Sequence, residues 1–123
     1  MTFAASVQSG FNNFLNPTGR TSVSGFWWYV LCLWILSGVL GTIGGFINGR
    51  GMEQDWLGII FEVFSALLFA STVCASIRRL HDSGKSGWNV WWYIFPVVGW
   101  IIIIVMLCRS SQPGSNKYGP QPQ

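Results

Sequence analysis

The sequence predicts an all-α membrane protein with three hydrophobic helices, the third kinked at Pro96, and a short N-terminal helix on the membrane surface. Half of its 123 residues are hydrophobic and only 9% are charged, whereas ordinary soluble domains are about 25% charged. A soluble domain this small could not cover so much apolar surface, because small domains leave a large share of their surface in water. The apolar residues also gather in three long runs, which lipid can cover instead.

Residues 1–25 are expected to form an interfacial N-terminal segment. Apolar side chains recur at helical spacing along residues 2–15, and the residues of the opposite face are polar but uncharged. The apolar stripe consists of Phe3, Val7, Phe11, Phe14 and Leu15. We expect a helix that lies on the membrane and ends at Asn16–Gly19, and the alternative is a frayed terminus. No cleavable signal peptide is expected, because the first residues lack a basic start and an apolar run.

The transmembrane domain is predicted to cover residues 26–108. Its first two spans are expected at about 26–47 and 56–77, each opened by aromatic residues, which favour the headgroup boundary. At 1.5 Å per residue the first span is about 33 Å long, enough to cross a hydrocarbon core of about 30 Å.

The third span is expected at about 88–107, near the minimum length for one crossing. Pro96 removes a helical hydrogen bond and therefore predicts a kink. The alternative is that this segment re-enters the side from which it came. Residues 109–123 are rich in Ser, Gln, Pro and Gly and are expected to form a polar, flexible tail.

Small residues recur at intervals of four in both of the first two spans. They are Ser37, Gly41 and Gly45 in the first span, and Ala66 and Ala70 in the second. Such rows let two helices approach closely, so we predict that the two spans pack through them, and that they could also support a homo-oligomer. The alternative is the general richness of membrane helices in glycine.

Glu62 is the one charged residue inside these two predicted spans. A carboxylate within a membrane span is a functional candidate by default. Because Glu62 lies about two turns from Trp56, the simpler alternative is that it reaches back to the interface or pairs with Arg50.

The polar segment from Arg78 to Trp88 separates the second and third spans. It contains three of the seven basic residues and the single histidine, whereas the first loop contains only Arg50. Positive residues favour the cytoplasmic side, so we expect this loop and the N-terminus to be cytoplasmic. Three crossings would place the tail outside, and re-entry would place it inside.

No enzyme site is predicted in this segment. Gly84-Lys85-Ser86 resembles the end of a P-loop, but that motif needs a glycine where Arg79 stands. His81 and Asp82 are too few ligands for a metal-dependent phosphohydrolase, and a triad with the adjacent Ser83 is geometrically unfavourable.

Anion recognition is the chemistry that the segment supports, because arginine binds phosphate bidentately and glycine turns expose backbone N–H groups. The candidate lipid or partner contacts are Arg20, Arg78, Arg79, His81, Asp82, Lys85 and Trp88. Three interpretations stay open: a structural interfacial loop, a site for anionic lipid headgroups, and a docking site for another protein.

No cofactor, metal or nucleic-acid partner is predicted. The three cysteines, Cys32, Cys74 and Cys108, are widely spaced and lie in or at the end of apolar runs, which is typical of apolar fillers. A net charge of +3, scattered along the chain, is too small to indicate nucleic-acid binding.

Three motifs resemble the YhaH-like family of small bacterial inner-membrane proteins. They are Arg78-Arg79-Leu80-His81-Asp82 with Gly84-Lys85-Ser86-Gly87-Trp88, then Asn116-Lys117-Tyr118-Gly119-Pro120, and Gly19-Arg20 followed by Phe26-Trp27-Trp28. The family usually has a second arginine and a glutamate where this chain has Val23 and Gly25, which predicts weakened ion pairing between the N-terminal segment and the central motif.

The resemblance implies a bacterial inner-membrane location and a domain of unknown function, and it supplies no catalytic residues. We therefore expect a small, non-enzymatic, multi-pass inner-membrane protein whose cytoplasmic basic loop binds anionic lipid headgroups or a partner protein. The alternative is a small oligomeric transporter or channel subunit with Glu62 along the path.

Overall fold

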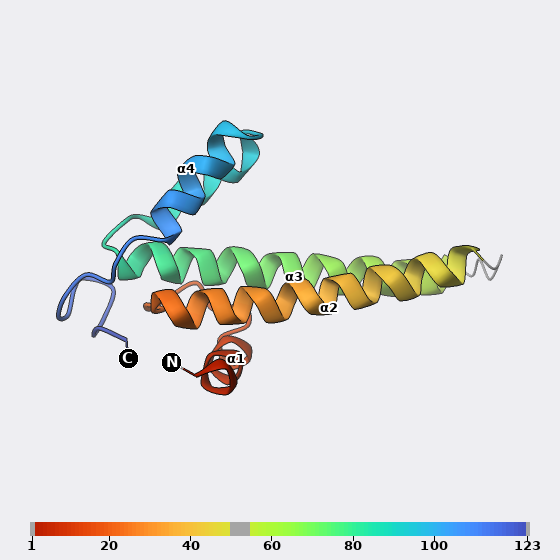
Figure 1. Cartoon of the computed structure of the whole chain (residues 1–123), viewed down its shortest axis with the longest axis horizontal. Coiled ribbons are helices and arrows are strands. Elements are labelled where there is room, and N and C mark those ends of the chain that lie inside the picture. The colour runs from red at the N-terminus through yellow and green to blue at the C-terminus, as the bar shows by residue number, and fades with distance from the viewer. Residues whose placement is uncertain (1, 50–54, 123) are drawn as a thin grey trace.

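The computed structural model describes residues 2–49 and 55–122, and the regular elements of this part are all helices. In chain order they are α1 (Phe3–Asn12), α2 (Val23–Gly49), α3 (Asp55–Asp82), the 3₁₀ helix η1 (Gly87–Ile94) and α4 (Val98–Leu107). The all-α prediction is confirmed for these residues. Helices α2 and α3 form a long antiparallel hairpin, with α1 on one side and α4 leaning away on the other (Figure 1). Both termini lie at the end where α2 begins and α3 ends (Figure 1).

Two helical stretches are long and apolar enough to cross a membrane, Val23–Ile47 and Trp56–Asp82. Only 11% of the apolar window of each is buried inside the protein. A core helix of a soluble domain would be mostly buried, so these surfaces need lipid to cover them. Arg50, which the sequence places in the connection between them, lies outside the described residues.

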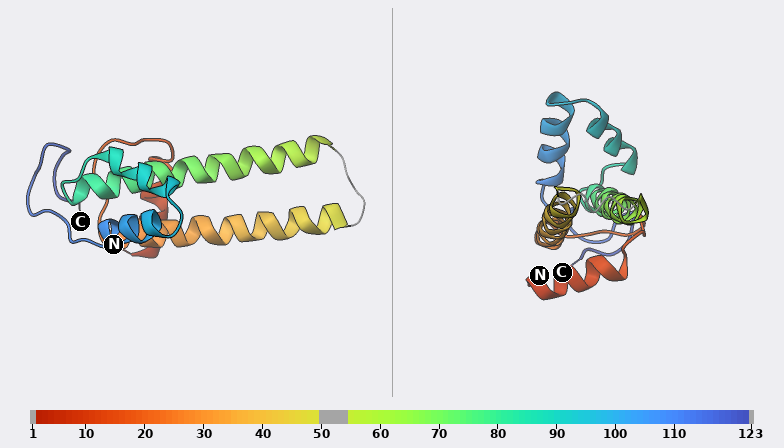
Figure 2. Two further views of the ribbon diagram at one scale, coloured as in Figure 1. Left: turned by 90° about the horizontal axis from the view of Figure 1, so that it is seen from above. Right: turned by 90° about the vertical axis from the view of Figure 1, so that its right-hand side faces the viewer.

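The third apolar segment is not the single kinked helix that was predicted over 88–107. It consists of η1, a turn at Phe95–Val97, and α4, which runs back towards the end of α3 (Figure 2). At about 1.5 Å per residue, the ten residues of α4 span about 15 Å, half of a hydrocarbon core. Pro96 therefore stands at a reversal rather than at a kink. We call η1, the turn and α4 together the re-entrant hairpin, because α4 returns towards the end of α3.

Backbone geometry explains why the chain reverses there. Val97 has φ 63° and ψ −69°, the strained γ-turn conformation that a β-branched residue adopts only when its surroundings hold it, and the N–H of Val98 donates to the carbonyl of Pro96 across it at 2.8 Å. Gly99 lies against η1 so closely that an added Cβ would stand 2.0 Å from the carbonyl oxygen of Trp92. The indole of Trp100 then donates to the carbonyl of Tyr93 at 3.0 Å, which joins the two arms of the re-entrant hairpin.

The buried core lies where α2, α3 and α4 meet. Its apolar members are Phe26, Tyr29, Val30, Leu33, Leu68, Ala75, Leu80, Ile103 and Leu107. Within it, the hydroxyls of Tyr29 and Ser71 share a hydrogen bond of 2.6 Å between α2 and α3. The core therefore lies towards the end of the α2–α3 hairpin at which α2 begins and α3 ends, where both chain termini also lie.

The N-terminal helix is present as α1 and packs on α2 through small residues. Ser6 and Gly10 are buried, and a Cβ at Gly10 would stand 2.2 Å from the ring of Tyr29. Three residues of the predicted apolar stripe, Phe3, Phe11 and Leu15, remain 44–54% exposed. The stripe therefore leaves a largely uncovered apolar surface on α1.

The rows of small residues do not lie between α2 and α3. Ser37, Gly41 and Gly45 are exposed, and a Cβ at either glycine would meet nothing within 4 Å. On α3, Ala66 is exposed and Ala70 is half-buried. The helices meet instead through the larger side chains of the core, so the predicted packing of α2 on α3 through these rows is not what the structure shows.

Candidate functional site

The central motif begins on a helix and not in a loop. Helix α3 continues to Asp82, which places Arg79 in its last turn and Arg78 directly before that turn. Their side chains point into the protein: Arg78 is 4% exposed, and Arg79 and Asp82 are fully buried. With Arg20, whose side chain is 1% exposed, these residues form a cluster that we call the arginine clasp (Arg20, Arg78, Arg79 and Asp82).

Arg79 joins α3 to the end of α4. Its Nη1 pairs with Asp82 Oδ2 at 2.5 Å, and its Nε donates to the carbonyl of Leu107 at 3.0 Å. Its Nη2 also donates to the carbonyl of Arg109. The last carbonyls of a helix lack intrahelical partners and carry partial negative charge, so the guanidinium both caps α4 and holds it against α3.

Arg78 joins α3 to the segment between α1 and α2. Its Nη1 donates to the carbonyls of Asn13 and Asn16 at 2.7 and 2.5 Å, and its Nε donates to Thr21 Oγ1 at 3.1 Å. The backbone N–H of Thr21 returns a bond to the carbonyl of Arg78 at 3.2 Å. The turn after α1 is thereby fixed to the end of α3.

Arg20 and Asp82 bring the tail to the same place. Arg20 Nη2 lies 3.0 Å from Asp82 Oδ1, and the guanidinium also donates to the carbonyls of Gln112, Gly114 and Gly119 at 2.6, 2.7 and 3.2 Å. Arg20 forms this ion pair by itself, and the weakening expected from Val23 and Gly25 stays a prediction. The tail therefore folds back over the clasp.

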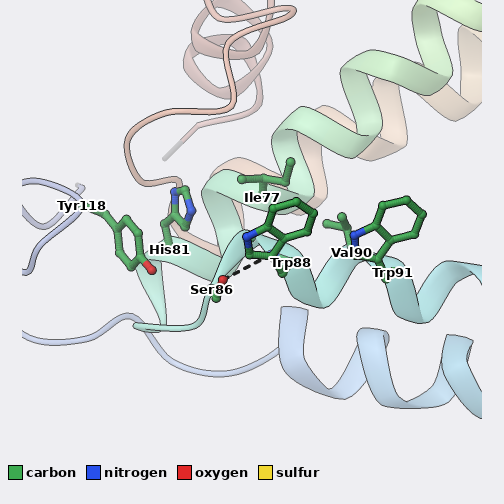
Figure 3. Close-up of a pocket in the computed structure, with 8 residues that line it drawn as sticks. Ile77, His81, Ser86, Trp88, Val90, Trp91 and Tyr118 are labelled. Carbon is green, nitrogen blue, oxygen red and sulfur yellow. Dashed lines mark hydrogen bonds between the residues drawn. The ribbon is translucent and has the colours of Figure 1, made fainter.

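His81 lies at the edge of the clasp. Its Nδ1 is 3.2 Å from the carbonyl of Gly19, and because a carbonyl can only accept, Nδ1 is the donor. Its ring stacks on Tyr118 of the tail, with centroids 3.9 Å apart and planes 4° from parallel (Figure 3). Asn116 Nδ2 donates to the carbonyl of His81 at 3.0 Å, which holds the tail in this position.

The described residues contain no arrangement that points to catalysis. The oxygens of Asp82 are occupied by Arg20, Arg79 and the hydroxyl of Ser111. Ser83 donates to the carbonyl of Leu80, so it does not form a triad with His81. Among residues 2–49 and 55–122, no group of three or more His, Cys, Asp or Glu side chains could hold a metal ion.

The other predicted site residues lie apart from the clasp. Lys85 is half-buried, Trp88 is 76% exposed on η1, and Glu62 is exposed on the surface of α3. The structure thus joins Arg20, Arg78, Arg79 and Asp82 with His81 at their edge, and leaves Lys85 and Trp88 on the adjoining surface.

Several clasp partners were not singled out from the sequence. They are Asn13, Asn16, Thr21, Ser111, Gln112 and Gly114. Most contribute backbone carbonyls, which no side-chain pattern reveals. The one available signal was the Asn116–Pro120 motif, which carried part of the family resemblance and contains Gly119, whose carbonyl accepts a hydrogen bond from Arg20.

Residues 14–120 match the family described as "Protein of unknown function (DUF805)". The chain belongs to this family. The DUF805 match begins after α1 and includes the whole clasp together with the tail that covers it.

Relatives in Escherichia coli K12 agree with the DUF805 assignment. The chain is 31% identical to the inner membrane protein YhaH over 111 residues, which is 90% of each chain. It is 28% identical to the inner membrane protein YhaI over 112 residues, which is 90% of this chain and 89% of that protein. No solved structure gives a significant match. Together with the two helices that are long and apolar enough to cross a membrane, these relatives identify this DUF805 chain as a membrane protein.

Proposed function

We propose that this chain is a non-enzymatic protein of the bacterial inner membrane whose cytoplasmic face, assembled by the arginine clasp, contacts anionic lipid headgroups. It crosses the bilayer twice, through α2 and α3, and inserts the re-entrant hairpin into the cytoplasmic leaflet only. The inner-membrane names of YhaH and YhaI support the location.

The observation that carries the proposal is the return of the tail to the end of α3. Because Arg79 binds the end of α4 and Arg20 binds the tail, six of the seven basic residues gather at one end. They are Arg20, Arg78, Arg79, Lys85, Arg109 and Lys117. Asp82 is the one acid that accompanies them in the clasp, and such an excess of positive charge favours the cytoplasmic side.

The clasp divides these six residues into two groups. The side chains of Arg20, Arg78 and Arg79 are buried, and their N–H groups donate to acceptors within the protein. Arg109 and Lys117 are exposed, and Lys85 is half-buried. The proposed headgroup contacts are therefore these last three residues, each of which adds roughly 1 kcal/mol near an anionic surface, while the buried arginines hold the surface in shape.

Insertion of the re-entrant hairpin into one leaflet follows from its length and its surface. Ile94, Phe95, Val97, Val98 and Ile101 are each 58–64% exposed around its turn. Irregular backbone is disfavoured in hydrocarbon unless its polar groups are paired, and here Phe95 and Val98 donate to the carbonyls of Trp92 and Pro96 within the turn.

A pair of C-terminal fusions tests the topology. We expect a green fluorescent protein fusion to fluoresce and an alkaline phosphatase fusion to be inactive, because both terminal segments lie on the cytoplasmic side. A matched fusion that ends after α2 should give the reverse result. An active phosphatase at residue 123 would restore three crossings and exclude the single-leaflet hairpin.

Lipid preference tests the headgroup contact. In native mass spectrometry of the purified protein, we expect phosphatidylglycerol to be retained over phosphatidylethanolamine. The preference should fall several-fold in the triple variant Lys85→Gln, Arg109→Gln, Lys117→Gln. Equal retention of both lipids by the unaltered protein would contradict anionic-lipid binding and would turn the search towards a protein partner for the same surface.

Glu62 supports a second candidate, an oligomeric transporter or channel subunit. An exposed carboxylate on a membrane-spanning helix is costly in hydrocarbon, and a second copy that covered it would remove that cost. Proteoliposome ion flux that disappears in Glu62→Gln, from a protein that is oligomeric in detergent, would favour this candidate. A monomer without flux would exclude it.

A further inference from the structure

A groove lies between the end of α3, the start of η1 and the tail. Its volume is about 400 Å³, within the range of about 300–1,000 Å³ that is usual for small-molecule sites. Figure 3 shows its two ends, with His81 and Tyr118 face to face at one and Trp91 at the other. Ser86 and Trp88 lie between them. The groove therefore changes from polar to apolar along its length.

The polar end offers both donors and acceptors. Because Nδ1 of His81 donates to Gly19, the Nε2 atom of the neutral ring is left as an acceptor. Ser86 Oγ accepts from the backbone N–H of Trp88 at 3.3 Å, so its own hydrogen can be donated to a ligand. The ammonium of Lys117 lies 5.0 Å from the Tyr118 ring centroid and brings positive charge to this end.

The apolar end is formed by side chains that face outward. Trp88 is 76% exposed and Trp91 is 56% exposed, and Ile77 of α3 forms the wall opposite them. Indole rings prefer the boundary between headgroups and hydrocarbon. An elongated, amphipathic molecule that already lies in that boundary matches this gradient.

We propose that the groove binds a single phospholipid with a hydroxyl-bearing anionic headgroup, such as phosphatidylglycerol. The phosphate accepts from Ser86 at the polar end, to which Lys117 adds positive charge over Tyr118. A headgroup hydroxyl donates to His81 Nε2, and the glycerol and upper acyl carbons lie along Trp88 and Trp91. This inference rests on the proposed function and deepens it, because it replaces a diffuse contact with one site.

Docking of the tail completes the site. Tyr118 forms one wall, and it is held there by its stacking on His81 and by its N–H bond to Asn116 Oδ1 at 2.8 Å. Asn116 is in turn bound to the carbonyl of His81. Because Arg20 of the clasp binds the same tail at Gln112, Gly114 and Gly119, the clasp also helps to position the polar end of the groove.

Lipid retention by native mass spectrometry tests the site, with the full-length protein in detergent and either phosphatidylglycerol or phosphatidylethanolamine added. We expect one phosphatidylglycerol to survive collisional activation that removes all others. The variant Trp88→Ala and the double variant Trp88→Ala, Trp91→Ala should lose that species, and Trp56→Ala, which changes a 57% exposed tryptophan at the opposite end of α3, should keep it. Unchanged circular dichroism spectra of the variants show that folding is preserved.

The outcomes separate the groove from the proposed function. Phosphatidylglycerol lost only from the lysine and arginine variants, and kept by both tryptophan variants, would overturn the groove while headgroup binding stands. One lipid of either kind, lost only from the tryptophan variants, would support the groove and overturn the anionic preference. Displacement of the retained lipid by millimolar glycerol phosphate would overturn the groove, because the indoles would then contribute nothing. Retention of no lipid would overturn both.

Discussion

The two ends of the α2–α3 hairpin differ in what holds them. At the clasp end, α1, the re-entrant hairpin and the tail surround the helices, and the charged clasp is hidden among backbone carbonyls. In the distal half, which we define as residues 34–47 and 56–67, large apolar side chains face outward, and Trp34 and Ile59 are 63% and 61% exposed. Protein contacts specify the first region, and lipid has to complete the second.

The two regions differ in whether their contacts have fixed directions, and therefore in how many substitutions they tolerate. Hydrogen bonds of a guanidinium have fixed directions, so each clasp arginine accepts few substitutions. Contacts with lipid tails are non-directional, so one apolar side chain can replace another in the distal half. Matched substitutions in the two regions should therefore differ in size, and in one case in sign.

The largest effect is expected for Asp82→Asn. This change leaves the buried guanidinium groups of Arg20 and Arg79 without their shared carboxylate, and removing one partner of a buried ion pair typically costs about 3–5 kcal/mol. Unfolding by SDS titration, followed by circular dichroism, measures the loss. Ile59→Leu in the distal half is the control, because one exposed apolar side chain replaces another there, with an expected change within about 0.5 kcal/mol. Similar losses in both variants would remove the distinction between the regions.

A pair of glycine substitutions should change stability in opposite directions. Gly10→Ala places a methyl group into the ring of Tyr29, and overpacking of this kind typically costs about 1–3 kcal/mol. Gly41→Ala meets nothing within 4 Å, and the higher helix propensity of alanine should stabilise α2 by about 0.5–1 kcal/mol. The same SDS titration compares them. A destabilised Gly41→Ala variant would mean that another surface, such as a second copy, approaches the distal half there.

The smallest effect is expected for Tyr29→Phe. It removes the 2.6 Å hydrogen bond to Ser71, and bonds between membrane helices contribute about 0.6 kcal/mol on average and up to about 1.7 kcal/mol. The distal control is Thr42→Val, because Thr42 bonds only the carbonyl of Gly38 in its own helix. A loss in Thr42→Val that equalled the loss in Tyr29→Phe would show that hydrogen bonds between helices give the clasp end no special stability.

The sequence predicted the helices better than their contacts. Composition and apolar runs predicted α1, α2 and α3, because apolar periodicity and length are local properties. The reversal at Phe95–Val97 was weighed only as an alternative, since it depends on Gly99 fitting against the carbonyl of Trp92. Arg78 and Arg79 were candidate contacts for lipid or a partner protein, yet they bind carbonyls of Asn16 and Leu107 that lie far away in the sequence. Every residue carries a backbone carbonyl, so the residue types in a sequence do not reveal which carbonyls will accept these hydrogen bonds.

The span of the Arg20 contacts has a consequence for the order of assembly. Arg20 precedes its acceptor Gln112 by 92 residues and its acceptor Gly119 by 99. During synthesis its guanidinium therefore lacks these acceptors until α2, α3, α4 and the tail have been made. The α2–α3 hairpin needs only neighbouring segments, and contacts between distant segments close late. Membrane insertion and clasp closure are therefore separate events, and the clasp can close only after the tail has been synthesised.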